Sequence, residues 1–178
     1  LAHDDEVLIN GWLAEDLHAK PGDELEMKFY VVGLARTLEE KSARFRVRGV
    51  LPMSGPAADP TLMPDFPGLK DAKNCREWDT GLPVQFDRIR EQDNKYWEDH
   101  RGTPKAFLNL AAGQKLWSNR FGELTAVRFP MASTSREQIT ETLLRGLQPG
   151  AVGLNFEPVA AHALAAVEQS QDFGGLFL

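Results

Sequence analysis

Alternation of apolar and polar residues, the period of a half-buried strand, marks two segments at residues 25–31 and 44–48. The apolar positions of this pattern are Leu25, Met27, Phe29, Val31, Phe45 and Val47. Paired as neighbours, the two strands would set Glu26 close to arginine side chains on the polar face. We therefore expect a hairpin, with a polar loop from Gly33 to Ser42.

A short apolar strand is predicted at residues 7–9, directly before a helix. Asn10 is of the residue type that caps helices, because its side-chain oxygen can accept from a free backbone N–H. Leu13 and Leu17 then fall four residues apart, on one helical face. The segment 20–23, Lys-Pro-Gly-Asp, supplies the turn that leads into the hairpin.

Regular elements return after Pro104. Strands are predicted at residues 105–110, 124–129 and 151–156, and a short helix at 111–117. Thr134 and Glu137 have capping-box spacing and open a second helix. The last helix follows Pro158, a residue that a first helical turn tolerates.

The segment 53–104 has a different character, because repeated prolines interrupt any long element. One helix is predicted within it, near residues 87–100, with Phe86, Ile89, Tyr96 and Trp97 on one side. The chain is therefore expected to form a single α+β domain over residues 1–178. Its mixed sheet carries packed helices in the order β-α-β-β and then β-α-β-α-β-α, with a long Pro- and Asp-rich insertion at 53–104.

The net charge, the cysteine count and the length of the apolar stretches limit the classes of function that this chain can have. The formal net charge is −6, and Lys and Arg form no concentrated block, so a nucleic-acid partner is not expected. A single cysteine excludes an intramolecular disulfide and a multi-cysteine metal site. No stretch reaches about 18 apolar residues, the length of a membrane span. The apolar run 173–178 is expected either to dock on the core or to lead into a hydrophobic segment.

Candidate chemistry is sparse. Cys75 and His100 share the insertion and could form a nucleophile and base, but no catalytic cysteine motif flanks Cys75, and a structural thiol is the favoured interpretation. The insertion's carboxylates lack the spacing of a calcium loop, and no phosphate-binding glycine motif is present. We predict no catalytic, cofactor-binding or metal-binding residues and no cofactor.

Aromatic residues are the most suggestive feature of the insertion. They are Phe66, Trp78, Phe86, Tyr96 and Trp97. Because aromatic side chains carry much of the energy of interfaces, Phe66, Trp78, Tyr96 and Trp97 are candidates for a partner surface. The alternative, which we favour, is that these aromatics form the small core of the insertion.

Several segments together resemble the extracytoplasmic, MacB-like periplasmic core domain of FtsX-like ABC transporter permeases. These segments are VLINGWLAEDL at 7–17, AKPGDEL at 19–25, VRGV at 47–50, AFLNLAAGQKLW at 106–117 and LTAVRF at 124–129. Two further segments, PDFPG at 64–68 and CREWD at 75–79, resemble a subgroup of large permeases. The order of these motifs, more than any one of them, carries the resemblance.

The resemblance implies a non-catalytic domain of a cytoplasmic-membrane protein, placed on the extracytoplasmic side. It implies a cytoplasmic ATP-binding subunit as partner, and coupling of ATP-driven transmembrane motion to an external protein, lipoprotein or small molecule. A permease dimer is also implied, and residues 173–178 would lead into a transmembrane helix.

Two alternatives remain open. One is a soluble hydrolase or metal-dependent enzyme with its site in the 53–104 insertion, which should gather titratable side chains in a concave pocket. The other is a small soluble adaptor that uses its hairpin for strand addition.

Overall fold

A computed structural model describes residues 1–33, 37–69, 71–79, 81, 84–119, 121–130, 132–155 and 157–171, the side chains of 168–171 excepted. By its internal contacts the chain divides into two compact units, Leu1–Val127 and Arg128–Leu178. The sequence led us to expect one domain, and this expectation stays a prediction. The apolar run 173–178 lies outside the described residues.

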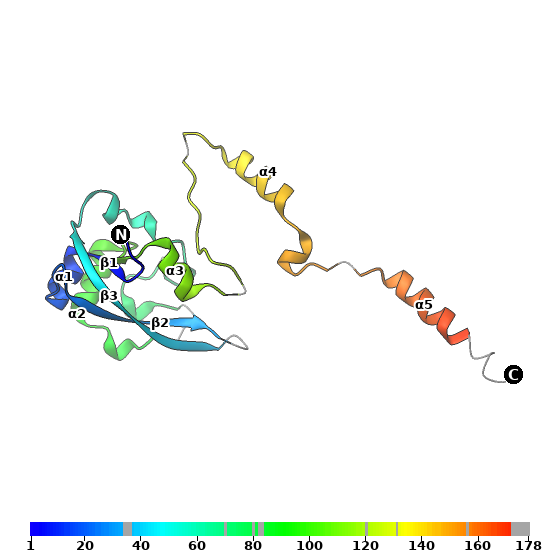
Figure 1. Ribbon diagram of the computed structural model, residues 1–178, viewed down its shortest axis with the longest axis horizontal. Coiled ribbons are helices and arrows are strands. Elements are labelled where there is room, and N and C mark those ends of the chain that lie inside the picture. Colours follow the sequence, from blue (N-terminus) through cyan, green and yellow to red (C-terminus); the bar gives the residue numbers. More distant parts are fainter. Residues whose placement is uncertain are drawn as a thin grey trace. The chain divides into compact units, whose positions relative to one another are not determined.

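The first unit is built on a curled four-stranded mixed sheet (Figure 1). Its strands are β1 (Glu6–Asn10), β2 (Glu24–Val32), β3 (Leu38–Leu51) and β4 (Ala106–Phe107), in the spatial order β2-β3-β1-β4. β1 runs parallel to β3, and the other pairs are antiparallel. The predicted α+β fold is confirmed.

The β2–β3 hairpin follows the alternating pattern of the sequence. Leu25 lies opposite Phe45, and Glu26 lies opposite Arg44. On the polar face Arg44 forms an ion pair of 3.5 Å with Glu24. The loop is shorter than predicted, because β2 continues to Val32 and β3 begins at Leu38. Residues 34–36 lie outside the described part of the chain.

The helices of this unit are α1 (Gly11–Leu17), α2 (Glu91–His100) and α3 (Leu110–Trp117). Apolar side chains of α1 and α3 pack on the buried side of the sheet, against Val7, Ile9, Phe45 and Val47. The opposite face carries exposed arginines of β3. One apolar and one polar face is the usual arrangement of an antiparallel or mixed sheet with one solvated side.

The insertion 53–104 is mostly irregular, as its prolines predicted. It contains α2 and short 3₁₀ helices at Gly55–Ala58, Pro60–Leu62, Cys75–Glu77 and Phe86–Arg88. The predicted helix at 87–100 begins only at Glu91. Asp93 accepts from the Arg90 backbone N–H at 3.1 Å, which closes the first turn of α2 and sets its start at this point.

Two predicted strands do not form. Among the described residues, 124–129 and 151–155 contain no strand, and a 3₁₀ helix at Pro149–Val152 replaces the start of the second. The predicted strand 105–110 is also reduced, to β4. After β4 the order is therefore α3 and then two further helices. Alternating residues form a strand only where a neighbouring strand accepts their backbone hydrogen bonds, and these segments have none.

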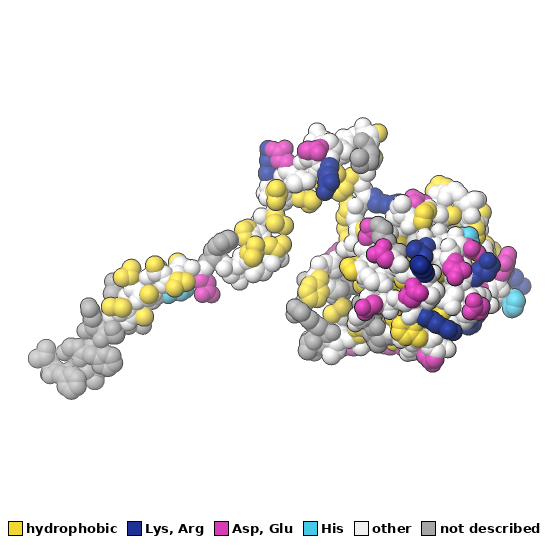
Figure 2. All heavy atoms as spheres, turned by 180° about the vertical axis from the view of Figure 1, so that it is seen from behind, with side chains coloured by type: hydrophobic (Ala, Val, Ile, Leu, Met, Phe, Trp, Pro, Cys, Tyr) yellow, Lys and Arg dark blue, Asp and Glu magenta, His cyan; other side chains and the backbone are white. Residues whose placement is uncertain are grey.

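The second unit contains α4 (Arg136–Gly146) and α5 (Val159–Gln171), close to their predicted positions. The capping box of α4 lies one residue later than expected, between Ser135 and Gln138. None of the described residues of this unit is buried. Figure 2 shows apolar side chains along both helices, and they include Leu143, Leu144 and Leu164. Across the described residues, no helix combines the length and apolar character that crossing a membrane requires.

Candidate functional site

The insertion leaves and returns at one end of the sheet, where Asn10 joins three segments. Asn10 pairs with Leu51, the last residue of β3, and its backbone N–H donates to the carbonyl of Lys105 at 2.9 Å. Its side-chain Oδ1 caps α1 by accepting from Leu13 N at 2.8 Å. Its Nδ2 donates to the Tyr96 hydroxyl at 2.9 Å and to the carbonyl of Pro104 at 3.2 Å.

A lysine lies among aromatic rings beside this junction. The Lys105 Nζ is 3.8 Å from the centre of the Trp12 ring and 4.6 Å from that of Tyr96. The two rings lie 4.7 Å apart, and the same ammonium is 3.3 Å from the Asp93 carboxylate. An ammonium over two ring faces is held by their quadrupoles. Lys105 therefore links α1 to α2.

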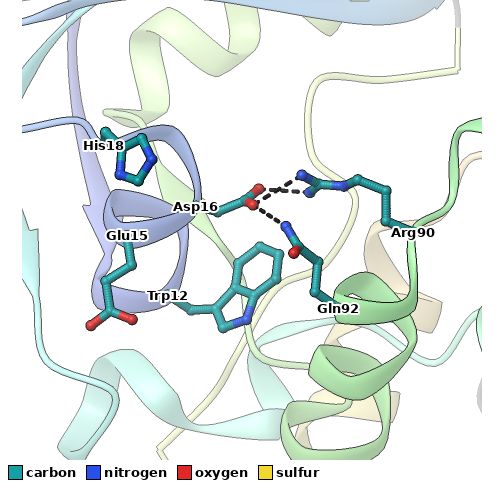
Figure 3. A pocket seen from close by; sticks show the side chains of 6 residues that line it. All are labelled: Trp12, Glu15, Asp16, His18, Arg90 and Gln92. Atoms are coloured by element: carbon teal, nitrogen blue, oxygen red, sulfur yellow. Dashed lines mark hydrogen bonds and ion pairs between the residues drawn. The ribbon is translucent and has the colours of Figure 1, made fainter.

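An open pocket of about 440 Å³ lies between α1 and the start of α2. Its lining side chains are Trp12, Glu15, Asp16, His18, Arg90 and Gln92 (Figure 3). Figure 3 shows Asp16 of α1 directed toward Arg90 and Gln92. Arg90 contacts Asp16 by two parallel bonds of 3.0 and 2.7 Å, and Gln92 donates to the same carboxylate.

This pocket is better suited to holding the insertion than to catalysis. Both oxygens of Asp16 accept hydrogen bonds from Arg90, and one of them also accepts from Gln92, so the carboxylate is held by the guanidinium in a structural ion pair. Hydrogen bonds from Arg90 to Asp16 and then to Asp93 raise the pKa of the Arg90 guanidinium further above its usual range. Bidentate Arg–carboxylate contacts fix geometry strongly, and here they join α1 to the insertion.

A second hollow, which we call the Trp78 cavity, lies inside the insertion and measures about 320 Å³. Its apolar lining consists of Met63, Trp78, Ile89, Tyr96 and Trp97. Its polar lining includes Arg88, Asp93, His100, Thr103 and Lys105. A concave, largely aromatic hollow with a few polar groups is the usual form of a small-molecule site.

The polar groups of the Trp78 cavity differ in how fully they are bonded. Burial by itself raises the pKa of Asp93, but hydrogen bonds from Arg90 and the attraction of Lys105 outweigh it, so that pKa lies below its ordinary value. The buried Trp78 Nε1–H has no acceptor within the part of the chain that the structure describes. Among the described acidic residues, none forms an ion pair with Arg88.

Cys75 and His100 both line the Trp78 cavity, but the thiol is poorly suited to nucleophilic attack. Cys75 is buried, and its Sγ lies 3.7 Å from the backbone carbonyl of Asp93. Burial, and next the negative charge of Asp93, raise the pKa of the Cys75 thiol, whereas a reactive cysteine needs a lowered pKa. In the described part of the chain, no group of three or more His, Cys, Asp or Glu is placed to hold a metal ion.

The structure brings together three of the four aromatic residues proposed as a partner surface. Tyr96 and Trp97 are only 6% and 7% exposed, and the Trp78 and Trp97 rings lie 5.0 Å apart, edge to face. Phe66 is 41% exposed and does not line the Trp78 cavity. Burial of Tyr96 and Trp97 favours the core interpretation for this pair. A partner surface that includes Phe66 and Trp78 stays a prediction.

Sequence reasoning missed Arg88, Asp93 and Lys105 at this site. No local pattern singles them out, because Lys105 is the first residue of a predicted strand and Arg88 and Asp93 fall within the helix predicted near residues 87–100. The one available signal was the mixture of charged and aromatic residues near α2. Such a mixture is typical both of solvated helices and of ligand sites.

A scan of protein-family models finds no match to this chain, and searches of the curated proteins and of the solved structures find no match either.

Proposed function

We propose that this chain is an extracytoplasmic domain of an FtsX-like ABC transporter permease. In this role it has no catalytic reaction of its own. It binds an external protein, lipoprotein or small molecule and passes to it the motion that a cytoplasmic ATPase drives through the membrane.

One observation carries the proposal. The segments that resemble the permease domain are far apart in the sequence, at 7–25, 47–50 and 106–117, yet they meet in one sheet. β1 pairs with β3 on one side and with β4 on the other, and α1 and α3 pack on the same buried face. A single domain of the permease kind requires its segments to assemble in this way, and their assembly supports the proposal.

The attachment of the insertion also supports a coupling role. An element that transmits motion must be held rigidly at its base, since a loosely tethered loop absorbs the displacement. The insertion is held by Asn10, by the Asp16–Arg90 contact and by Lys105. These three contacts all join it to α1 or to the residue that caps α1.

The test is the location and topology of the full gene product in its source cell. We expect it in the cytoplasmic membrane fraction, with apolar stretches of about 20 residues beside this segment. Protease added outside spheroplasts should cleave within residues 1–178 and spare the cytoplasmic side. Recovery of the intact product in the soluble fraction, or cleavage only after lysis, would overturn the proposal.

A further inference from the structure

The Trp78 cavity combines three features that point to a ligand. Its wall carries three aromatic rings, one of its hydrogen-bond donors is buried with no acceptor among the described residues, and the exposed Arg88 that lines it forms no ion pair with a described residue. We propose that this cavity binds a small organic carboxylate with a flat apolar body. The inference goes beyond the proposed function and does not depend on it.

The apolar side chains that line the cavity determine the shape of the ligand's apolar part. Trp78 and Trp97 present their rings edge to face, and Met63 and Ile89 add flexible and branched apolar surface. Flat aromatic groups pack well against such rings because stacked and edge-to-face contacts are both favourable. A hollow of about 320 Å³ accommodates a two-ring compound at the lower end of the size range of ligand pockets.

The unpartnered donor indicates an acceptor on the ligand. The Trp78 Nε1–H is buried and bonds to no group of the described residues, whereas the neighbouring Trp97 Nε1–H donates to the carbonyl of Ala72 at 2.9 Å. Buried donors in folded proteins are nearly always bonded. A ligand oxygen beside Trp78 would restore the missing bond.

The charges indicate that this acceptor is anionic. Lys105 and Arg88 line the cavity together with a single carboxylate, that of Asp93. The charge of the Asp93 carboxylate is already neutralised, because Arg90 Nε lies 3.0 Å from one of its oxygens and Lys105 Nζ lies 3.3 Å from the other. Arg88 is left with the planar, forked donor set that matches a carboxylate. A cationic ligand would meet Arg88 and Lys105 with no free carboxylate to offset them.

Calorimetric titration of the whole chain, residues 1–178, with naphthaleneacetate and its neutral amide tests the proposal. The carboxylate is expected to bind at least about tenfold more tightly than naphthaleneacetamide, because its charge-assisted bonds are stronger. Acetate alone, which lacks the apolar body, should give no measurable binding at the same concentrations. Equal affinity for the carboxylate and the amide, or no binding by either, would overturn the proposal.

Two substitutions locate the bound ligand. Arg88→Gln should weaken the binding of naphthaleneacetate about tenfold and leave the affinity for the amide unchanged. Arg76→Gln, at an exposed arginine of the same insertion that does not line the cavity, should change neither the affinity for naphthaleneacetate nor the affinity for the amide.

The Trp78 indole N–H signal, assigned by its loss in Trp78→Phe, should move in the NMR spectrum as naphthaleneacetate is added. An unmoved Trp78 signal, or an Arg88→Gln protein that binds as the parent does, would contradict the assignment.

Discussion

The side-chain amide of Asn10 donates to the hydroxyl of Tyr96 at 2.9 Å, across 86 positions of sequence. Asn10 ends β1 and caps α1, and Tyr96 is buried in α2 of the insertion. Tyr96 in turn donates to the carbonyl of Thr103 at 2.9 Å. This short chain of buried hydrogen bonds therefore connects the sheet to the insertion, and it is where we expect substitutions to act most strongly.

Replacing Asn10 with Ala should lower the free energy of unfolding by about 2–4 kcal/mol, through loss of the helix cap and of the bonds to Tyr96 and Pro104. Urea denaturation followed by circular dichroism measures this change. Asn10→Ser keeps an oxygen for the cap but cannot reach Tyr96, so it should recover about 1 kcal/mol of the loss. A change below about 0.5 kcal/mol in Asn10→Ala would show that the junction contributes little.

Tyr96→Phe removes only the hydroxyl and should cost about 1–2 kcal/mol. Because the two side chains bond directly, the effects of Asn10→Ala and Tyr96→Phe should not add. A double-mutant cycle should give a coupling free energy above about 0.5 kcal/mol. Tyr30→Phe, at an exposed position of β2, serves as the matched control and should change stability by less than about 0.5 kcal/mol. Additive effects of the two junction substitutions would contradict the bond.

Stability should fall in acid in a way that depends on Asp93. The pKa of Asp93 is lower in the folded chain than the ordinary value of 3.8. The ionised carboxylate therefore contributes fully to the free energy of unfolding above about pH 4, and this contribution is lost as the pH falls through the folded pKa. Asp93→Asn should cost about 2 kcal/mol at neutral pH. The difference from the parent protein should shrink as the pH approaches about 2.

Denaturation curves over this pH range measure the effect of Asp93. Asp99→Asn, at an exposed residue that pairs with Lys95 on the same helix, controls for the loss of a carboxylate. A difference between Asp93→Asn and the parent protein that stayed constant with pH would mean that the charge of Asp93 is not what stabilises the fold.

Gly102 should resist substitution because it combines a positive φ of 80° with a close approach to the backbone. A Cβ at this position would collide with the carbonyl of Pro60. Gly102→Ala should therefore cost more than the ~1–2 kcal/mol of left-handed backbone strain alone. Gly81 has a φ of 65°, and no atom of the described residues outside its own chain neighbours lies within 4 Å of an added Cβ, so Gly81→Ala should show only that strain. Equal losses in the two variants, measured by thermal unfolding, would argue against the contact with Pro60.

Local elements of this fold could be predicted from the sequence where their signals lie within a few residues. Asn10 is the predicted helix cap, and the alternating pattern predicts Glu26 close to arginines of the neighbouring strand, where the structure pairs it with Arg44. The helices α4 and α5 were also located correctly. Each of these features depends on backbone propensity, on one capping side chain or on a single periodicity.

The predicted strands at 124–129 and 151–156 show the limit of that reasoning. Val127 belongs to an alternating pattern, but it is 61% exposed, and no strand of the described residues pairs with its segment. A strand gains its stability from pairing and from cross-strand contacts, and neither is encoded in the strand itself. For this reason the pattern identified a candidate strand without deciding whether it would pair.

The candidate site depends on contacts between distant segments, which short-range patterns in the sequence do not specify. The sequence by itself determined the α+β class, the hairpin and the Asn10 cap, because these rest on short-range periodicity and turn chemistry. Only the tertiary structure decided that Asn10 bonds to Tyr96, that Lys105 lies between Trp12 and Asp93, and that Trp78 is left without an acceptor. Those contacts join residues far apart in the chain, and a residue's type and local pattern do not specify which distant side chain it will meet.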